Sequence, residues 1–339
     1  MHKTTRLQFW QVKRPNQIDR VISNMITELA EDIFAIEARF EDVPMKVYVI
    51  LADRITVIDP GTSNTPLTRI EPALTTLGLR LKNIDLIINT HGHHDHRGGN
   101  GAIKKANPSV HVAAHRDDAP WIEDSGTYIA DEYLRFHPDL KLPKSFLSRV
   151  STLCGEDSFV DELLIDGQEV RLGPGHTLFV RHVPAHTPGS IAVFHEQQRV
   201  LFVGDALQAR GTPLWKRPDF FPAYASLYHY QESLEYFEGC GAKLIGTSHQ
   251  GVCTPHRAAN LIADSRTFTN ELSAYLYQHL RRRKRTTLSE AANSVLGEWP
   301  RYERTAQLFK TVGAHLDELQ RDGLAASMSG APDIYNLVD

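Results

Sequence analysis

Four histidines and one aspartate fall within six consecutive residues, in the stretch HGHHDH that begins at residue 91. The preceding stretch, NIDLIINT, is almost wholly apolar, which is typical of a strand buried on both faces of a sheet. His91 and His93 are two residues apart, so an extended backbone places both on one side. Asp95 and His96 fall on the turn into the next helix and can face a second ion. Imidazole and carboxylate groups are the donors that zinc, iron and manganese prefer, so the stretch indicates a metal site.

Three further residues of these types follow apolar, strand-like runs. They are His186 in VPAHTPGS, Asp205 in LFVGDAL and His249 in IGTSHQG. Such positions bring side chains from different strands to one edge of a sheet, so these residues are expected to converge with the first group. Small residues beside them, such as Gly204, allow the backbone to turn close to an ion.

The remaining pattern predicts a mixed α/β body. β-branched, alternating runs predict a β-meander over about residues 25–60, and apolar residues at helical spacing predict a helix over 66–79. Residues 116–150 are aromatic, helix-leaning and interrupted by prolines, so they are expected to form an insertion on the sheet. Further strands and a helix follow, and after about residue 255 only helices are expected.

Composition limits the location and the partners. The 339 residues carry a net charge of −4, and no run of apolar residues is long enough for a signal peptide or a membrane span. Three cysteines without a CxxC pair suit a reducing compartment, so a cytoplasmic protein is expected. The basic run RRRKR at 281–285 is expected to be a solvated helix end rather than a nucleic-acid site. Neither nucleic acid nor membrane is an expected partner.

HxHxDH, HTPGS, a GD pair after a strand and a final loop histidine together resemble the metallo-β-lactamase superfamily over roughly residues 25–255. The resemblance implies a four-layer αββα sandwich for residues 1–255, in which 116–150 form a lid-like helical insertion. Residues 256–339 are similar to the winged-helix-like tail of some members. HTPGS and LFVGDAL are most similar to glyoxalase II and related thioesterases.

The resemblance also implies a role for each candidate ligand. A first ion would be held by His91, His93 and His186. A second ion would be held by Asp95, His96 and His249, with Asp205 bridging both. Asp59, in VIDPG, matches an aspartate that supports a ligand histidine from behind. Two divalent ions per chain are therefore expected, zinc first, with iron or manganese as alternatives.

Two neighbouring ions make hydroxide available from a bridging water, which predicts hydrolysis with Asp95 and Asp205 as catalytic residues. The aspartate at position 205 argues against a zinc β-lactamase. The predicted substrate is a thioester, an ester or a lactone. Three alternatives stay open: a phosphoester hydrolase of the same fold, a mononuclear-iron oxidoreductase, and a non-catalytic ligand-sensing regulator.

Aromatic residues in the insertion and in the loop after Asp205 predict a small-molecule pocket for a bulky acyl or aromatic group. The equally weighted alternative is that they pack the insertion against the body. The candidate substrate-binding residues are Trp121, Tyr133, Trp215, Phe221 and Tyr224. In members that carry such a C-terminal tail it is usually structural, so here it is expected to close the substrate site or to form the interface of a homodimer.

Overall fold

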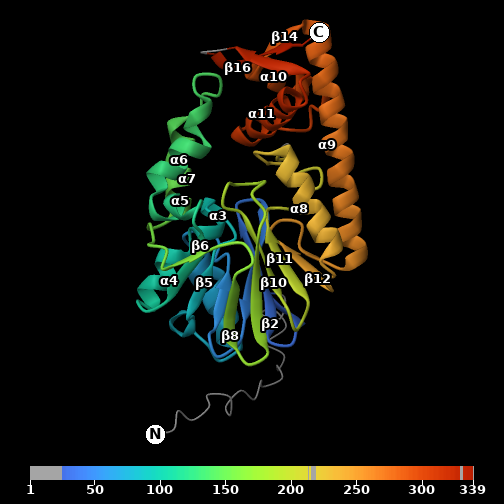
Figure 1. The fold of residues 1–339 in the computed structure, drawn as a ribbon. Coiled ribbons are helices and arrows are strands. Elements are labelled where there is room, and N and C mark those ends of the chain that lie inside the picture. Colours follow the sequence, from blue (N-terminus) through green and yellow to red (C-terminus); the bar gives the residue numbers. More distant parts are fainter. Residues whose placement is uncertain (1–24, 213, 215–218, 329–330, 339) are drawn as a thin grey trace.

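The computed structural model describes residues 25–212, 214, 219–328 and 331–338, and its centre is a pair of β-sheets with helices on both outer sides (Figure 1). The first sheet runs in the order β1 (Ile26–Ala30), β2 (Ile33–Phe40), β3 (Val43–Ile50), β4 (Thr56–Ile58), β5 (Leu86–Ile88), β6 (His111–His115) and β7 (Glu162–Leu164). The second runs in the order β13 (Val252–Cys253), β12 (Leu244–Thr247), β11 (Val200–Gly204), β10 (Ile191–His195), β9 (His176–His182) and β8 (Glu169–Gly173).

Strand β3 shows why two layers of apolar side chains form. Tyr48 and Ile50 pack between the two sheets, against residues such as Phe202 of β11. Val47 and Val49 point the other way, because successive side chains of a strand alternate between its faces. That outer face is covered by α2 (Glu71–Thr76) and α4 (Asn100–Ala106). The strand is therefore buried on both sides.

Helices α8 (Leu227–Gly239) and α9 (Pro255–Arg283) cover the outer face of the second sheet. Leu234 of α8 and Ile262 of α9 pack there with Leu201 and Val203 of β11. The order of layers is helix, sheet, sheet, helix, so the predicted αββα sandwich is confirmed.

Strand direction decides where polar loops gather. Strands β4, β5, β6 and β7 are parallel, and so are β11 and β12. The segments that leave the carboxyl ends of these strands lie at one edge of the sandwich. The short helix α3 (His94–Arg97) begins at this edge, six residues after β5 ends.

The insertion contains α5 (Ala119–Glu123), α6 (Ser125–Glu132) and α7 (Lys144–Cys154). It has a small apolar core of its own, in which Trp121 and Tyr128 pack with Val150 and Cys154. The helical character predicted for 116–150 is present, and the last helix extends to Cys154.

The C-terminal region is not built from helices alone, so that expectation is wrong. After α9 come α10 (Leu288–Glu298) and α11 (Ala306–Arg321), accompanied by a three-stranded sheet in the order β14 (Arg285–Thr287), β16 (Ala331–Leu337) and β15 (Ala325–Met328). Strands β14 and β15 have only three and four residues, and β14 shows no apolar alternation, so the sequence pattern does not reveal them. Residues 281–285 are exposed where α9 ends, as predicted for a solvated helix end. Among the described residues, no helix is long and apolar enough to cross a membrane.

Candidate metal centre

Three histidines form the first group of candidate ligands, at the sheet edge. His91 and His93 follow β5, and His186 lies in the loop between β9 and β10. One nitrogen of each lies within 4.8 Å of the others. His93 Nδ1 is 3.0 Å from His186 Nε2. All three side chains are buried, so their donor atoms face the protein interior rather than bulk water.

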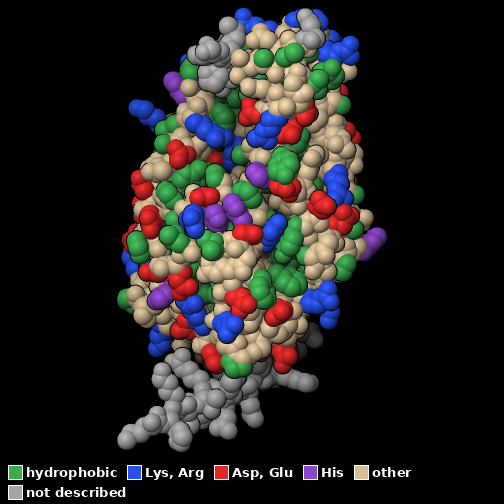
Figure 2. Space-filling view, in the orientation of Figure 1, with side chains coloured by type: hydrophobic (Ala, Val, Ile, Leu, Met, Phe, Trp, Pro, Cys, Tyr) green, Lys and Arg blue, Asp and Glu red, His purple; other side chains and the backbone are tan. Residues whose placement is uncertain are grey.

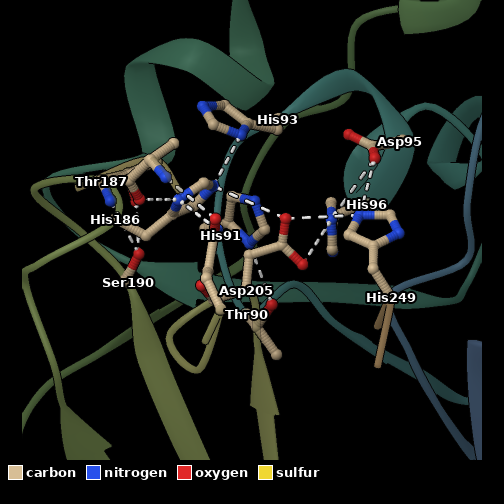
Figure 3. A network of polar contacts seen from close by, with 12 residues as sticks. Thr90, His91, His93, Asp95, His96, His186, Thr187, Ser190, Asp205 and His249 are labelled. Atoms are coloured by element: carbon tan, nitrogen blue, oxygen red, sulfur yellow. Dashed lines mark hydrogen bonds and ion pairs between the residues drawn. The ribbon is translucent and has the colours of Figure 1, made fainter. Parts of the chain in front are cut away.

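The second group lies beside the first and contains Asp95, His96 and His249. His249 Nε2 is 3.3 Å from Asp95 Oδ2, and His96 Nε2 is 3.7 Å from the same oxygen. Asp205, which follows β11, lies between the groups (Figure 3). Its Oδ2 is 3.7 Å from His186 Nε2 and 3.3 Å from His249 Nε2. The structure thus brings all seven predicted ligands together.

The spacing of the donor atoms fits divalent metal ions. Donors about 2.05 Å from a tetrahedral zinc ion lie roughly 3.3 Å from one another. Six of the donor pairs here are separated by 3.0 to 3.7 Å, and the donors of each group all lie within 4.8 Å of one another. The buried atoms that lack a hydrogen-bond partner within the described part of the chain include His91 Nε2, His96 Nε2 and Asp205 Oδ1. Buried polar atoms are rarely left unpaired, so the residues fit a site that binds metal through these atoms.

Hydrogen bonds behind the ligands fix which nitrogen faces the centre. His96 Nδ1 donates to Asp59 Oδ2 at 3.0 Å, and Asp59 also accepts from the Thr90 backbone and hydroxyl at 2.7 and 2.6 Å. His91 Nδ1 lies 3.1 Å from the same hydroxyl. In both histidines Nε2 is left free to bind a metal. This is the supporting position that the resemblance implied for Asp59.

Backbone carbonyls hold two other ligands in the same manner. His186 Nδ1 donates to the Ala223 carbonyl at 2.6 Å, and His249 Nδ1 donates to the Pro44 carbonyl at 2.7 Å. Gly204, next to Asp205, has a φ of 51°, and a Cβ there would lie 2.2 Å from Thr90 Oγ1. Only glycine fits this close approach, which places Asp205 against the loop that follows β5.

The charges of the two groups differ. Burial alone would lower the pKa of His96, but the carboxylates of Asp95, Asp205 and Asp59 raise it to about 9. Burial opposes ionisation of Asp95, yet the neighbouring histidines, His96 first, hold the pKa of that carboxyl well below its usual range. The carboxylates of the second group therefore stabilise a positive charge placed beside them. In the first group, by contrast, burial lowers the pKa of His186 to about 3, which leaves a neutral imidazole donor.

Asp118 supports the site but was not selected from the sequence. It is fully buried and accepts hydrogen bonds from Gly92 N at 2.7 Å, Gly189 N at 2.7 Å and Thr187 Oγ1 at 2.6 Å. It thereby joins the loop of His91 and His93 to the loop of His186. A signal for it existed, because Asp118 follows β6 at the same sheet edge as the ligands.

A cavity with about 250 Å³ of space for water-sized molecules adjoins the ligands, reaching His93, Asp95, Asp205 and His249. Its walls come from three parts of the chain: the body, the insertion and the C-terminal region. The apolar side chains in the lining include those of Phe40, Val43, Leu142, Phe146, Val150, Leu153, Phe220 and Ala306. The insertion and the C-terminal region both shape the space next to the ligands.

Two of the five predicted substrate-binding residues, Tyr133 and Phe221, line this cavity. Trp121 instead lies behind His93, with the two rings nearly parallel and their centroids 6.1 Å apart. Tyr224 is fully buried, stacks on Tyr230 and has its hydroxyl 2.8 Å from His315 Nε2. The packing alternative describes Trp121 and Tyr224 better. Trp215 lies outside the described residues.

The chain belongs to the metallo-beta-lactamase superfamily, because a sequence model of that superfamily matches residues 44–249. The resemblance read from HxHxDH and the later motifs is thereby confirmed. The fold is also similar to the crystal structure of a metallo-beta-lactamase family protein from Thermus thermophilus. The TM-score is 0.71 at 19 % identity, and the match covers 92 % of this chain and 100 % of the other. It therefore includes most of the C-terminal region.

Proteins with similar sequences are named for different activities. A probable metallo-hydrolase of Bacillus subtilis, YqjP, is 26 % identical over 60 % of this chain and 67 % of its own length. A hydroxyacylglutathione hydrolase of Methylococcus capsulatus is 29 % identical over 41 % of this chain and 40 % of its own. The mitochondrial persulfide dioxygenase of Homo sapiens is 28 % identical over 56 % and 58 %. The chain spans less than two thirds of the length of each of the last two relatives.

Proposed function

We propose that the protein is a two-metal hydrolase that cleaves a thioester or an ester, lactones included, of a bulky acyl or aromatic compound. The observation that carries this proposal is the position of Asp205 between two complete groups of ligands, at the end of a largely apolar cavity. When bound, two divalent ions lower the pKa of water and polarise a carbonyl oxygen. Zinc suits the mixed nitrogen and oxygen donors, and so do iron and manganese.

The chain's own residues would orient water and move a proton. Asp95 and Asp205 have their pKa values held low by neighbouring histidines, against the effect of burial, so both carboxylates are ionised at neutral pH. Either can accept a hydrogen bond from water and aim its oxygen at an acyl carbon. Both carboxylates line the cavity, but Asp205 lies beside both groups of ligands whereas Asp95 belongs to the second group. We therefore assign to Asp95 the role of taking the proton and returning it to the leaving oxygen or sulfur. A bond forms from the water oxygen to the acyl carbon, and the bond to the leaving group breaks.

The cavity supports the choice of substrate. Phe40, Phe146 and Phe221 contribute aromatic surface, which suits an apolar acyl body more than a phosphodiester. On the face shown in Figure 2, basic and acidic side chains are intermixed without a large area of one sign, which supports a small-molecule partner over nucleic acid. The absence of membrane partners, the cytoplasmic location and a homodimer remain predictions.

Metal analysis paired with turnover tests the proposal. Protein purified without added metal is analysed for bound metals and assayed against an acyl thioester, an aryl ester, a lactone and a phosphodiester. About two metals per chain, with turnover confined to the carbonyl substrates, is the expected result. Turnover of the phosphodiester alone would instead identify a phosphoester hydrolase.

Similarity to the persulfide dioxygenase favours a second candidate, an iron-dependent oxidoreductase. The complete second group of Asp95, His96 and His249 supports the two-metal hydrolase over this alternative. One iron per chain, with oxygen consumption and no hydrolysis, would overturn the proposal in favour of the oxidoreductase. Tight ligand binding without any turnover would favour the regulator.

A further inference from the structure

A buried ion pair adjoins the first group of ligands and joins two regions outside the sandwich. Lys310 lies in α11, in the C-terminal region, and Glu132 ends α6, in the insertion. Lys310 Nζ is 2.5 Å from Glu132 Oε1, and the two side chains are only 2 % and 3 % exposed. The same Oε1 lies 3.5 Å from His93 Nε2. Lys310 Nζ also donates to the His186 carbonyl at 3.5 Å, so the pair touches two ligand residues.

Stability alone does not account for this pair. Removing two charges from water costs several kcal/mol per ion, and an apolar pair of similar volume often stabilises a fold as well or better. What the pair contributes here is the orientation of the Glu132 carboxylate. The carboxylate of Glu132 is held 3.5 Å from His93 Nε2. This nitrogen is buried and has no hydrogen-bond partner within the described residues.

The two nitrogens of His93 face different surroundings. Nδ1 lies 3.0 Å from His186 Nε2 and so points into the first group of ligands. Nε2 points toward Glu132. A histidine that binds a metal through one nitrogen commonly donates its other N–H to a carboxylate, which fixes the ring and makes it a better donor. Glu132 occupies the place of that carboxylate.

We propose that Glu132 is a positioning residue that orients the His93 imidazole for the first metal, and that Lys310 holds Glu132 in place. On this assignment, the C-terminal region completes the first metal site, although it supplies no ligand. The inference rests on the proposed two-metal site. It adds that an ion pair between the insertion and α11 affects how tightly the first metal is bound.

Helix α11 also contacts the body through side chains other than Lys310. Thr311 Oγ1 donates to the Pro222 carbonyl at 2.6 Å and accepts from Tyr224 N at 3.1 Å. One turn further, His315 contacts the Tyr224 hydroxyl. Residues 311 and 315 are four apart and therefore lie on one face of the helix. Thr311→Val is a control for general disturbance of the docked helix, since it removes these two hydrogen bonds but keeps both charged side chains of the Glu132–Lys310 pair.

The test measures metal affinity rather than turnover. Metal-free full-length protein is titrated with Co²⁺ against a chelator, and the visible absorption of bound cobalt separates the two sites. Glu132→Gln is expected to weaken the first site by about 10- to 100-fold and change its spectrum, with the second site unchanged. Lys310→Met should act in the same direction, Lys310→Arg should restore much of the affinity, and Thr311→Val should retain both sites.

A double-variant comparison separates positioning from general damage. If Lys310 acts through Glu132, Lys310→Met should have little further effect on the first site once Glu132→Gln is present. Equal weakening of both sites would show a merely structural role and overturn the inference, as would unchanged affinity in Glu132→Gln. If Glu132→Gln does not fold, the Lys310→Met and Lys310→Arg pair decides. Wild-type protein that binds fewer than two ions would instead refute the proposed two-metal function.

Discussion

His93 Nδ1 lies 3.0 Å from His186 Nε2, although the two residues are 93 positions apart in the chain. The contact exists because the end of β5 and the loop between β9 and β10 meet at one edge of the two sheets. Asp118, from a third segment, bonds to both loops and keeps them together. The first group of ligands is thus a product of the whole sandwich, and it depends on residues that bind no metal.

Replacing His93 should remove the first metal. His93→Ala deletes one of three imidazoles that converge on one point, so we expect about one metal per chain instead of two, and at least a 100-fold loss of hydrolysis. Elemental analysis and the ester assay measure both effects. His229→Ala is the matched control, because His229 is 44 % exposed and its ring nitrogen pairs with Glu232 in the same helix. Two bound metals in His93→Ala would contradict the ligand assignment.

Replacing Asp118 should damage stability and the first group together. Asp118→Ala leaves two buried backbone N–H groups and the Thr187 hydroxyl without their shared acceptor. Each unsatisfied buried group costs about 1–3 kcal/mol, so the free energy of unfolding should fall by roughly 3 kcal/mol or more. Urea unfolding of metal-free protein measures this loss. Asp117→Ala is the neighbouring control, since its side chain is 47 % exposed, and a similar loss in that variant would count against the specific role of Asp118.

Much of the site could be predicted because its signals are local. His91, Asp205 and His249 each follow an apolar strand, and a strand that ends at a known edge delivers the next side chains to that edge. The αββα order could be predicted because the same motifs resemble those of a superfamily, and the match to the sequence model of that superfamily confirms the resemblance.

What could not be predicted depends on contacts between distant segments. Nothing near Lys310 marks it, because an isolated lysine in an amphipathic helix is ordinarily a solvated residue, and only docking of α11 buries it. Strands β14 and β15 are too short to give a sequence pattern, and β16 forms a sheet only by pairing with both of them. Trp121 and Tyr224 resembled pocket residues by type, and only the structure shows that they pack inside.

Narrowing or widening the cavity should change substrate preference but not metal content. Phe146 lines the cavity and packs edge-on against Tyr133 at 5.3 Å between ring centroids. Loss of its ring removes apolar contact worth about 1.5 kcal/mol, so Phe146→Ala should raise KM about 10-fold for a bulky acyl ester. KM for an acetyl ester should be nearly unchanged. Phe159→Ala, at a side chain that is 69 % exposed, serves as the control. Equal effects on both esters would remove Phe146 from the proposed acyl pocket.

His315 should make the fold less stable as the pH falls. It is buried between the Tyr224 hydroxyl and Ser273 Oγ, each 2.8 Å from a ring nitrogen, and burial lowers its pKa to about 3. The unfolded chain takes up a proton on this histidine below about pH 6.5, whereas the native state does not until about pH 3. The histidine therefore contributes nothing to the pH dependence above 6.5, and stability is lost between 6.5 and 3. The free energy of unfolding then falls with a slope that approaches about 1.4 kcal/mol per pH unit, or roughly 2.5 kcal/mol between pH 7.5 and 4.5.

Urea unfolding of metal-free wild type and His315→Gln at these two pH values measures the difference. The variant should lose about 2.5 kcal/mol less than wild type over this interval. If both proteins lose the same amount, His315 does not resist protonation in the native state, and its burial against Tyr224 does not make α11 docking sensitive to acid.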